Sequence, residues 1–365
     1  MSSSPTTIIE QQLKATRMPA EERSARMASP TFGAVFTEHM VTARYSEGRG
    51  WHSARVEPFG PLSMSPASGV LHYGQEIFEG LKAYRGPDDG VRLFRPECNA
   101  RRFQESARRL AMPELPEALF LNSVCELVEV DHAWLPRDTE RSLYLRPFMI
   151  ASEPFIGLRP AREYQFGVIA CPVGPVFRDG SAPLTVWVSG DHTRAAPGGT
   201  GAAKCGGNYA AAMSAHAQAT ASGCDQVVFL DAIERSFVDE LGGMNVFFVF
   251  DDGSLVTPPL TGAILPGITR DSAIKLARAS GHKVTERKYG IAEWRADAES
   301  GRLTEVFACG TAAAVAPIGR IRSADGEFQV ADGLGGPVTT KLRENLLGIQ
   351  YGRNTDMYGW TLRVR

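Results

Sequence analysis

The sequence predicts an α+β fold in two domains, with antiparallel or mixed sheets and flanking helices. Three observations support this prediction. The 365 residues exceed the size at which one hydrophobic core usually stops growing. Amphipathic helical patterns alternate with short strand-like runs. Met244–Phe250 and Ser254–Thr257 flank Asp251-Asp252-Gly253 as the strands of a hairpin would, and antiparallel pairing argues against a simple doubly wound sheet.

Composition narrows the class of protein. A net charge of −2 provides no basic field for a phosphate backbone, so we expect no nucleic-acid partner. The six cysteines form no C-x-x-C pair, which favours reduced thiols in the cytosol. The polar N-terminus lacks a signal-peptide pattern, and no apolar run is long enough to cross a membrane. We expect a soluble, cytoplasmic protein.

The domain prediction assigns 1–30 to an N-terminal extension, expected to be a mobile or partner-contacting arm, and 31–173 to a small domain. Strands are expected at 91–94, 142–150 and 166–173. A helix opened by Pro96 places Arg101 and Arg102 near its first turn, where one of them can face inward. A second amphipathic helix covers 120–128, and strand alternation puts Tyr144 and Arg146 on the same side.

An interdomain linker is predicted at 174–190, because Gly, Pro, Ser and Asp cluster there, and a large cofactor-binding domain at 191–365. This half contains strands at 184–188, 226–230 and 304–309 in addition to the hairpin. A helix is expected from Tyr209 to Ser222, ended by Gly223. Another follows Pro266-Gly267-Ile268-Thr269 and ends at Gly281.

The stretch Gly198–Tyr209 places Lys204 between two glycine clusters. Glycines let the backbone approach a ligand closely, so we interpret Lys204 as a Schiff-base lysine. The alternative is an exposed lysine on a flexible loop. A pyridoxal phosphate enzyme needs such a lysine, an acid facing the pyridine nitrogen, and donors that converge on a phosphate.

Candidates exist for each of these other demands. The helix start at Ile268 and Thr269 offers N–H groups and a positive dipole end, Thr311 adds a hydroxyl, and Arg102 adds a countercharge. Each has an alternative: the helix start could be an ordinary one that binds nothing, Thr311 could lie in a structural turn, and Arg102 could simply be solvated. Glu240 precedes a strongly apolar strand and is expected to be buried, facing either the ring nitrogen or an arginine.

Tyr209 could donate a hydrogen bond to the phenolic oxygen of the ring, or could simply pack in the core. Other chemistries lack their motifs. The seven histidines form no i, i+4 pair and no Cys/His cluster, so no metal site is expected. The phosphate-loop, dinucleotide-binding and G-x-S-x-G patterns are also missing.

The chain resembles the branched-chain amino acid aminotransferases of the fold-type IV pyridoxal phosphate family (D-amino acid aminotransferase-like fold), from about Thr31 onward and most closely the actinobacterial members. The motifs that carry the resemblance are His72-Tyr73 with Phe78-Glu79-Gly80, Tyr144-Leu145-Arg146-Pro147, Lys204–Tyr209, Glu240-x-Gly242-x-Met244-Asn245, Leu265–Arg270, Gly310-Thr311-Ala312 and Gly348–Gly352.

The resemblance implies roles for individual residues. Lys204 would be the catalytic lysine, Glu240 would face the ring nitrogen and Tyr209 the ring oxygen. The phosphate would be bound by Arg102, Ile268, Thr269 and Thr311. The substrate pocket would comprise Phe36, Tyr73, Phe78, Tyr144 and Arg146, with Gly243, Thr311, Ala312 and Ala313 at the carboxylate end.

The implied reaction is a ping-pong exchange of the amino group between leucine, isoleucine or valine and 2-oxoglutarate, in a homodimer whose loop 151–160 reaches the neighbouring site. The alternatives are another fold-type IV activity, D-amino acid transamination or aminodeoxychorismate lyase chemistry, or a non-catalytic binder. The chain departs from the mammalian pattern in three ways: Ala313–Ala316 replaces a C-x-x-C pair, Gly243 replaces Thr, and Val176 replaces Tyr.

Overall fold

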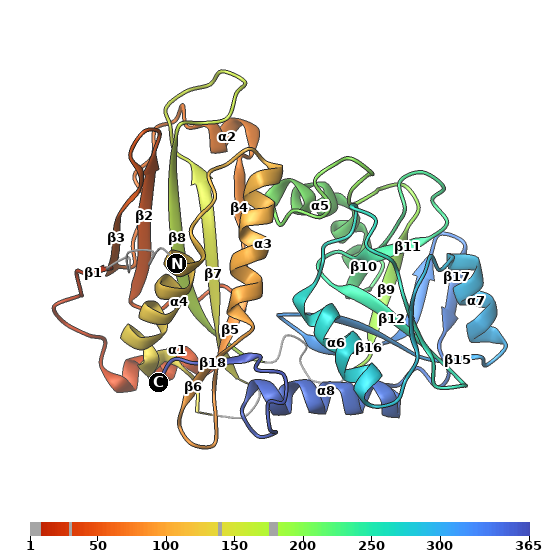
Figure 1. Cartoon of the computed structure of the whole chain (residues 1–365). Helices are drawn as coiled ribbons and strands as arrows, with labels where there is room; N and C mark the ends of the chain where they lie inside the picture. The colour runs from red at the N-terminus through yellow and green to blue at the C-terminus, as the bar shows by residue number, and fades with distance from the viewer. Residues whose placement is uncertain (1–8, 29–30, 138–140, 175–181) are drawn as a thin grey trace, which may run out of the picture. The chain divides into compact units, whose positions relative to one another are not determined.

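The structure is a computed structural model of the chain that describes residues 9–28, 31–137, 141–174 and 182–365 (Figure 1). The chain divides into two compact units. Unit 1 comprises Met1–Pro175, Ala203–Gly206 and Ile349–Arg365, and unit 2 comprises Val176–Ala202 and Gly207–Gly348. Each unit contains a large sheet with helices beside it. The predicted α+β class, with antiparallel and mixed sheets, is confirmed.

The chain returns to unit 1 twice after it has entered unit 2. Ala203 and Cys205 are buried in the core of unit 1. Near the C-terminus, β18 (Thr361–Arg363) pairs with β6 (Val91–Phe94). The sequence analysis placed both returning segments in its second domain, because contacts between residues far apart in the chain leave no local pattern.

The sheet of unit 1 has the strand order β1-β3-β2-β8-β7-β5-β6-β18, with β4 paired to β7. Its other strands are β1 (Glu10–Gln11), β2 (His39–Ser46), β3 (Gly50–Pro58), β4 (Glu76–Phe78), β5 (Leu81–Arg85), β7 (Ser142–Ala151) and β8 (Glu163–Val173). All described pairings are antiparallel except β1 with β3. The three strands predicted in this half are confirmed.

Helices α3 (Pro96–Arg109) and α4 (Glu117–Val130) are the two long helices of this unit, and α4 packs against β2 and β8. Both expected apolar faces are buried, including Phe103 on α3 and Phe120 on α4. The shorter helices are α1 (Ala20–Met27), α2 (Gly69–Tyr73) and the 3₁₀ turn η1 (His132–Trp134).

The N-terminal extension is not a free arm in its described part, 9–28. Strand β1 joins the edge of the sheet, and Arg17 pairs with the buried Asp131 at 2.9 Å. A two-residue strand and scattered ion pairs leave too little sequence pattern to be predicted, which explains why the extension looked unattached.

The sheet of unit 2 has the order β11-β10-β9-β16-β15-β12-β13-β14, with β17 paired to β16. The strands are β9 (Leu184–Ser189), β10 (Gln226–Leu230), β11 (Val238–Leu241), β12 (Asn245–Phe250), β13 (Leu255–Thr257), β14 (Val284–Glu286), β15 (Leu303–Gly310), β16 (Ala314–Ser323) and β17 (Gly326–Gln329). The predicted hairpin is confirmed as the antiparallel pair β12 and β13.

The helices of this half are α5 (Gly206–Ala221), α6 (Ile268–Ala279), α7 (Ile291–Glu299) and α8 (Pro337–Gln350). Helix α5 begins three residues before the predicted Tyr209, because its first residues are glycines, which signal a helix poorly. The helix predicted after Pro266-Gly267 is confirmed as α6.

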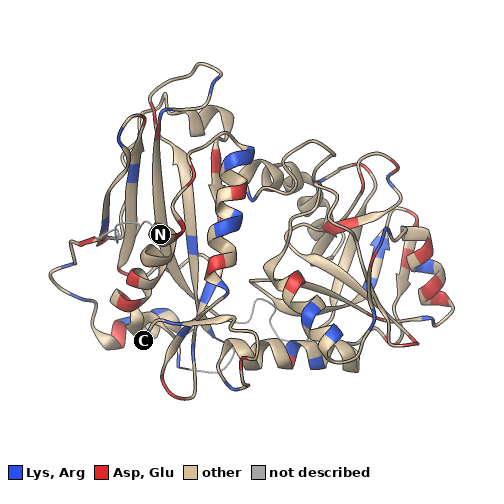
Figure 2. Cartoon of the chain, in the orientation of Figure 1, with Lys and Arg blue, Asp and Glu red and all other residues tan. Residues whose placement is uncertain are grey.

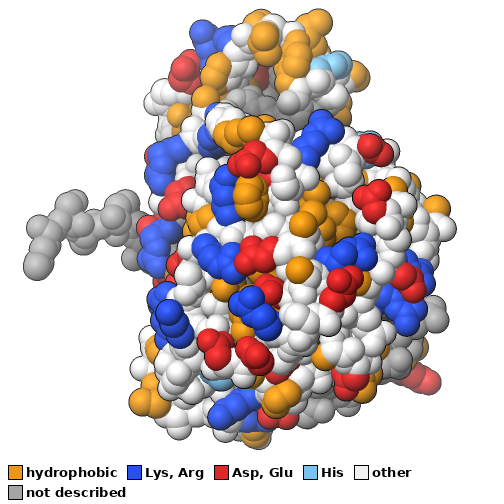
Figure 3. Space-filling view, turned by 90° about the vertical axis from the view of Figure 1, so that its right-hand side faces the viewer, with side chains coloured by type: hydrophobic (Ala, Val, Ile, Leu, Met, Phe, Trp, Pro, Cys, Tyr) orange, Lys and Arg blue, Asp and Glu red, His pale blue; other side chains and the backbone are white. Residues whose placement is uncertain are grey.

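Charge is mixed along the helices and strands (Figure 2). On the face shown in Figure 3, basic and acidic side chains are interspersed rather than gathered by sign. Among the described helices, none has both the length and the apolar composition needed to cross a membrane. No group of three or more His, Cys, Asp or Glu side chains suited to a metal ion occurs in the described residues.

Candidate active site

Lys204 is held in unit 1 by its backbone and by its two neighbours. Its N–H donates to Oγ of Ser106 on α3 at 2.9 Å, and its carbonyl oxygen accepts from the N–H of Phe78 at 3.0 Å. Ala203 and Cys205, on either side, are each only 3% exposed. The side chain of Lys204 therefore extends from a fixed backbone, which is not the arrangement of an exposed lysine on a flexible loop.

Arg102 is the inward-facing arginine of α3, and it pairs with a fully buried carboxylate. Its Nε and one terminal nitrogen donate to Glu79 at 2.7 and 2.9 Å, and Asn99 donates to the same carboxylate at 2.7 Å. Burial alone would raise the pKa of Glu79, but the Arg102 charge holds it below its ordinary value. The predicted phosphate ligand is thus a buried cation with a fixed orientation.

The predicted substrate residues of unit 1 form one cluster with one outlier. A terminal nitrogen of Arg146 donates to the hydroxyl of Tyr144 at 3.1 Å, as expected for residues on the same side of β7. The Arg146 guanidinium lies 4.7 Å from the centre of the Phe78 ring, and Lys204 Nζ lies 4.9 Å from it. Phe36 packs against the cluster that contains Tyr144.

The outlier is Tyr73 at the end of α2, which is 49% exposed. Its hydroxyl donates to the carbonyl oxygen of Ile156, in the loop that the sequence analysis assigned to a neighbouring subunit's site. Tyr73 is therefore tied to that loop rather than to the ring of Phe78.

Glu76 on β4 is a residue that the sequence analysis did not single out. It accepts a hydrogen bond from the N–H of Gly206, two residues after Lys204. Burial raises the pKa of Glu76, and the Gly206 N–H and the charge of Arg146 oppose this rise. The start of α5 is thereby anchored to the same strand that ends in Phe78.

In unit 2, Glu240 lies on β11 and is 2% exposed. One of its oxygens accepts from the N–H of Leu265 at 3.0 Å and lies 2.8 Å from Arg194. The prediction of a buried carboxylate is confirmed, and the arginine partner that had been left open as an alternative exists. Arg194 also donates to the carbonyl oxygen of Ala263 at 3.0 Å, so it fixes the chain that leads to Leu265.

Ile268 and Thr269 open α6, a helix of twelve residues whose N-cap, Gly267, provides no side-chain cap. The amide of Asn245 holds the carbonyl oxygen of Leu265 at 3.1 Å, which fixes the approach to the helix. The positive end of a helix dipole favours an anion. Thr269 is 5% exposed, so a phosphate at this end would be recognised mainly by main-chain donors.

Thr311, Ala312 and Ala313 form the tight connection between β15 and β16, where Gly310 pairs with Ala314. A Cβ placed on Gly310 would lie 3.5 Å from the carbonyl oxygen of Gly243. A Cβ on Gly243 would in turn lie 4.0 Å from the ring of Tyr209. The structure therefore brings together three predicted elements of unit 2: Tyr209, Gly243 and the 311–313 connection.

The glycines around Lys204 do different things. Gly198 has a φ of +77°, a conformation that side chains disfavour. Gly201 passes so close to Ala263 that a Cβ would lie 2.2 Å from its carbonyl oxygen. Gly207, by contrast, faces open space. At Gly201, therefore, the glycine allows the backbone to approach the backbone of Ala263 within the protein itself.

The predicted residues thus fall into two sets. Unit 1 carries Lys204, Arg102 and the Phe78 cluster, and unit 2 carries Glu240, Tyr209, the start of α6 and the 311–313 connection. Val176 lies outside the described residues. Sequence reasoning missed the supporting polar residues: Glu76, Asn99, Ser106 and Arg194. Only Glu79 had a signal, since it belongs to the Phe78-Glu79-Gly80 motif.

Comparison with known proteins agrees with this arrangement. Residues 76–321 match the family model of class IV aminotransferases, and the chain belongs to this family. It is 54% identical over 346 residues to a branched-chain-amino-acid aminotransferase of Mycolicibacterium smegmatis, covering 94% of each chain. The family predicted from the sequence is confirmed.

Solved structures agree as well. The branched-chain amino acid aminotransferase of Escherichia coli superposes with a TM-score of 0.75 at 28% identity, covering 90% of this chain and all of the other. The branched-chain enzyme of Thermobaculum terrenum, solved in its pyridoxal phosphate form, gives a TM-score of 0.74 at 25% identity, covering 90% and 99%. The predicted fold type is confirmed.

Proposed function

We propose that this protein is a branched-chain-amino-acid aminotransferase that uses pyridoxal 5'-phosphate. It exchanges an amino group between L-leucine, L-isoleucine or L-valine and 2-oxoglutarate by a ping-pong route. The observation that carries the proposal is the fixed presentation of Lys204, with its backbone bonded to α3 and β4 and its Nζ over the Phe78 ring. The relatives named above support the choice of substrates.

The residues present fit this cofactor, which when bound supplies a carbonyl for the amino group and an electron sink for the α-carbon. We assign its phosphate to Arg102, to the N–H groups of Ile268 and Thr269, and to Thr311. The position of Ile268 and Thr269 at the start of α6 supports this assignment, because the positive end of a helix dipole favours an anion. Arg102 keeps its charge and orientation through Glu79.

Glu240 is assigned to the ring nitrogen and Tyr209 to the ring oxygen. A buried carboxylate keeps its proton-accepting form only with positive or donating partners, and Arg194 supplies one of these. The ring nitrogen of the cofactor would be a second partner, and the Glu240 carboxylate would keep that nitrogen protonated. Lys204 Nζ is the group that takes the substrate's α-proton and returns it, as general base and then general acid.

The substrate side chain is assigned to Phe36, Tyr73, Phe78, Tyr144 and Arg146. Aromatic rings dominate this set, which suits a branched apolar side chain. Gly243, Thr311, Ala312 and Ala313 are assigned to the carboxylate end, and none of these four residues has a large side chain. We further assign the large cofactor-binding domain to 191–365, the small domain to 31–173 and the linker to 174–190, with 1–30 as the N-terminal extension.

A homodimer and a cytoplasmic location complete the proposal. The exposed Ile156 and Leu158, at 61% and 89%, support a loop that meets a second subunit. The six cysteines are free, as in a reducing compartment. Light scattering on the purified protein would measure the mass, and a monomer would contradict the assembly.

The experiment that tests the reaction mixes cofactor-loaded protein with L-Leu, L-Ile, L-Val, L-Glu or D-Ala and follows the cofactor absorbance. We expect conversion with the four L-amino acids. Conversion with D-Ala but not L-Leu would assign D-amino acid transamination instead. Lys204→Ala should keep the fold by circular dichroism and lose turnover by several orders of magnitude. Borohydride reduction followed by peptide mapping should label Lys204 and no other lysine.

A further inference from the structure

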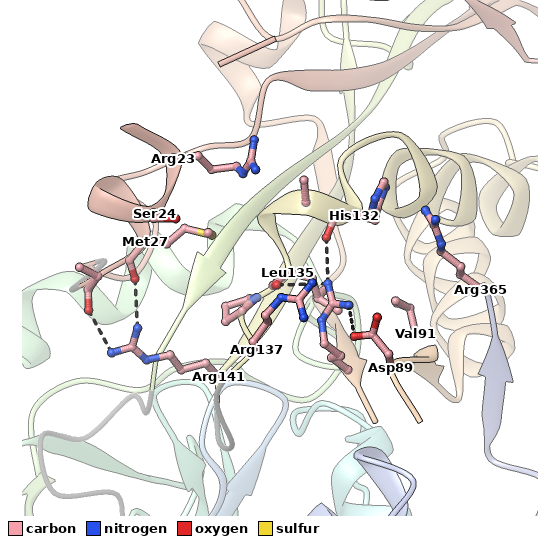
Figure 4. A pocket seen from close by; sticks show the side chains of 14 residues that line it. Arg23, Ser24, Met27, Asp89, Val91, His132, Leu135, Arg137, Arg141 and Arg365 are labelled. Carbon is pink, nitrogen blue, oxygen red and sulfur yellow. Dashed lines mark hydrogen bonds and ion pairs between the residues drawn. The ribbon is translucent and has the colours of Figure 1, made fainter. Parts of the chain in front are cut away.

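Unit 1 contains a cavity of about 570 Å³ that shares no residue with the candidate active site. Its lining comes from α1, the β5–β6 region, η1 with the segment after it, and Arg365 (Figure 4). The charged lining residues are Arg23, Arg85, Asp89, Arg137, Arg141 and Arg365. Segments from four parts of the chain therefore contribute charge to one small space.

The side-chain charge of this cavity is unbalanced. Five arginines line it, and Asp89 is the one acidic side chain among its lining residues. On the face shown in Figure 3, by contrast, basic and acidic side chains are interspersed. Gathering like charges costs free energy unless an opposite charge is near. A concentration of arginines on this scale calls for a physical reason.

Contacts within the protein occupy the terminal nitrogens of two of the five arginines, although the buried Nε–H of Arg85 has no acceptor in the described structure. Arg85 donates to Asp89 at 2.6 Å and to the carbonyl oxygens of His132 and Leu135 at 3.3 and 3.4 Å. Arg141 donates to the carbonyl oxygens of Met27 and Ala28 at 3.1 and 3.0 Å. These contacts hold the end of α1 and the end of η1 at the wall of the cavity.

The other three arginines are less fully explained. Arg23 makes one long contact, to the carbonyl oxygen of Met18 at 3.3 Å, and its buried Nε–H has no acceptor in the described structure. The guanidinium groups of Arg137 and Arg365 make no hydrogen bond or ion pair within the described residues. The pKa of Asp89 is lowered first by its hydrogen bond from Arg85 and further by the charges of Arg137 and Arg365. Buried donors without an acceptor are uncommon and indicate a missing partner.

We propose that this cavity binds a small polyanion of up to about nucleotide size, carrying at least two phosphate or carboxylate groups. Guanidinium groups bind these oxyanions in pairs of parallel hydrogen bonds. The volume lies in the range of small-molecule sites. Val91, Leu135 and Pro136, also in the lining, offer an apolar wall for the carbon part of such a ligand.

The test is calorimetric titration of the cofactor-loaded protein, in which the cofactor already fills its own phosphate site. ATP, pyrophosphate and citrate are the polyanions, and adenosine is the uncharged control. The variant Arg137→Gln/Arg365→Gln removes two charges and breaks no side-chain hydrogen bond or ion pair of the described structure. Arg320→Gln, an exposed arginine of β16 in unit 2, is the matched control.

We expect at least one polyanion to bind the wild type. Its dissociation constant should rise at least tenfold in the double variant and should also rise with added salt. In Arg320→Gln the dissociation constant should be unchanged. Citrate binding without the phosphates would assign carboxylates, and the reverse would assign phosphates. The inference is overturned if none of the three binds, or if the double variant binds as tightly as the wild type. Basal transaminase activity should be the same in all three proteins.

Discussion

Glu79 is the buried anion that keeps Arg102 in place, and Glu79→Gln should destabilise unit 1 strongly. The change removes the negative charge but keeps the size of the side chain. Arg102, only 6% exposed, would lose its countercharge, and the two donors at 2.7 and 2.9 Å would compete for one remaining oxygen. Removing one partner of a buried ion pair costs about 3–5 kcal/mol.

For a unit of this size, each kcal/mol shifts the melting temperature by roughly 2–4 °C. The expected decrease is therefore about 10 °C. Scanning calorimetry is the suitable assay, because two units can unfold in separate transitions. Glu114→Gln is the matched control: its partner Arg108 is 53% exposed, and such pairs contribute about 1 kcal/mol or less.

The effect has a defined pH dependence. Because the folded-state pKa of Glu79 lies below its ordinary value of 4.5, its contribution is complete above pH 4.5 and is lost as the pH falls through the folded-state pKa. The difference between wild type and variant should be constant from pH 6 to 8. A melting temperature of Glu79→Gln within 2 °C of the wild type would refute the reasoning.

Two further changes test unit 2. Gly201→Ala should lower stability by about 1–3 kcal/mol, because the new Cβ would collide with the backbone of Ala263. The control is Gly207→Ala: Gly207 lies in α5 and faces open space, so the change should be neutral or stabilising by up to about 1 kcal/mol. Denaturant titrations measure both variants, and an equal loss of stability in the two would contradict the close contact between Gly201 and Ala263. Asp239→Asn should stabilise the protein by about 1 kcal/mol at pH 8, after allowance for solvent screening. Burial, and secondly the charge of Asp231, raise the pKa of Asp239 to about 6, so the wild type loses stability as the pH rises towards 6. The stabilisation by Asp239→Asn should therefore vanish below pH 4. A stabilisation that persists in acid would argue against this cause.

Much of the fold followed from local pattern. The helix from Pro96 was predicted because its apolar residues recur every three or four positions, and the β12–β13 hairpin because Asp-Asp-Gly interrupts two apolar runs. Local pattern has a limit, however. The C-terminal strand and the segment around Lys204 join unit 1 through contacts with residues far away in the chain, which no window of sequence contains.

The sequence by itself determined the family, and it predicted the residues proposed to carry the chemistry, because a lysine, a carboxylate and phosphate donors must each occur in a specific local setting. Only the tertiary structure decided which groups support them: Ser106 on the backbone of Lys204, Glu79 on Arg102, and Arg194 on Glu240. The arginine cavity was likewise invisible in the sequence. A net charge of −2 averages over the chain, whereas electrostatic free energy depends on distances that only folding sets.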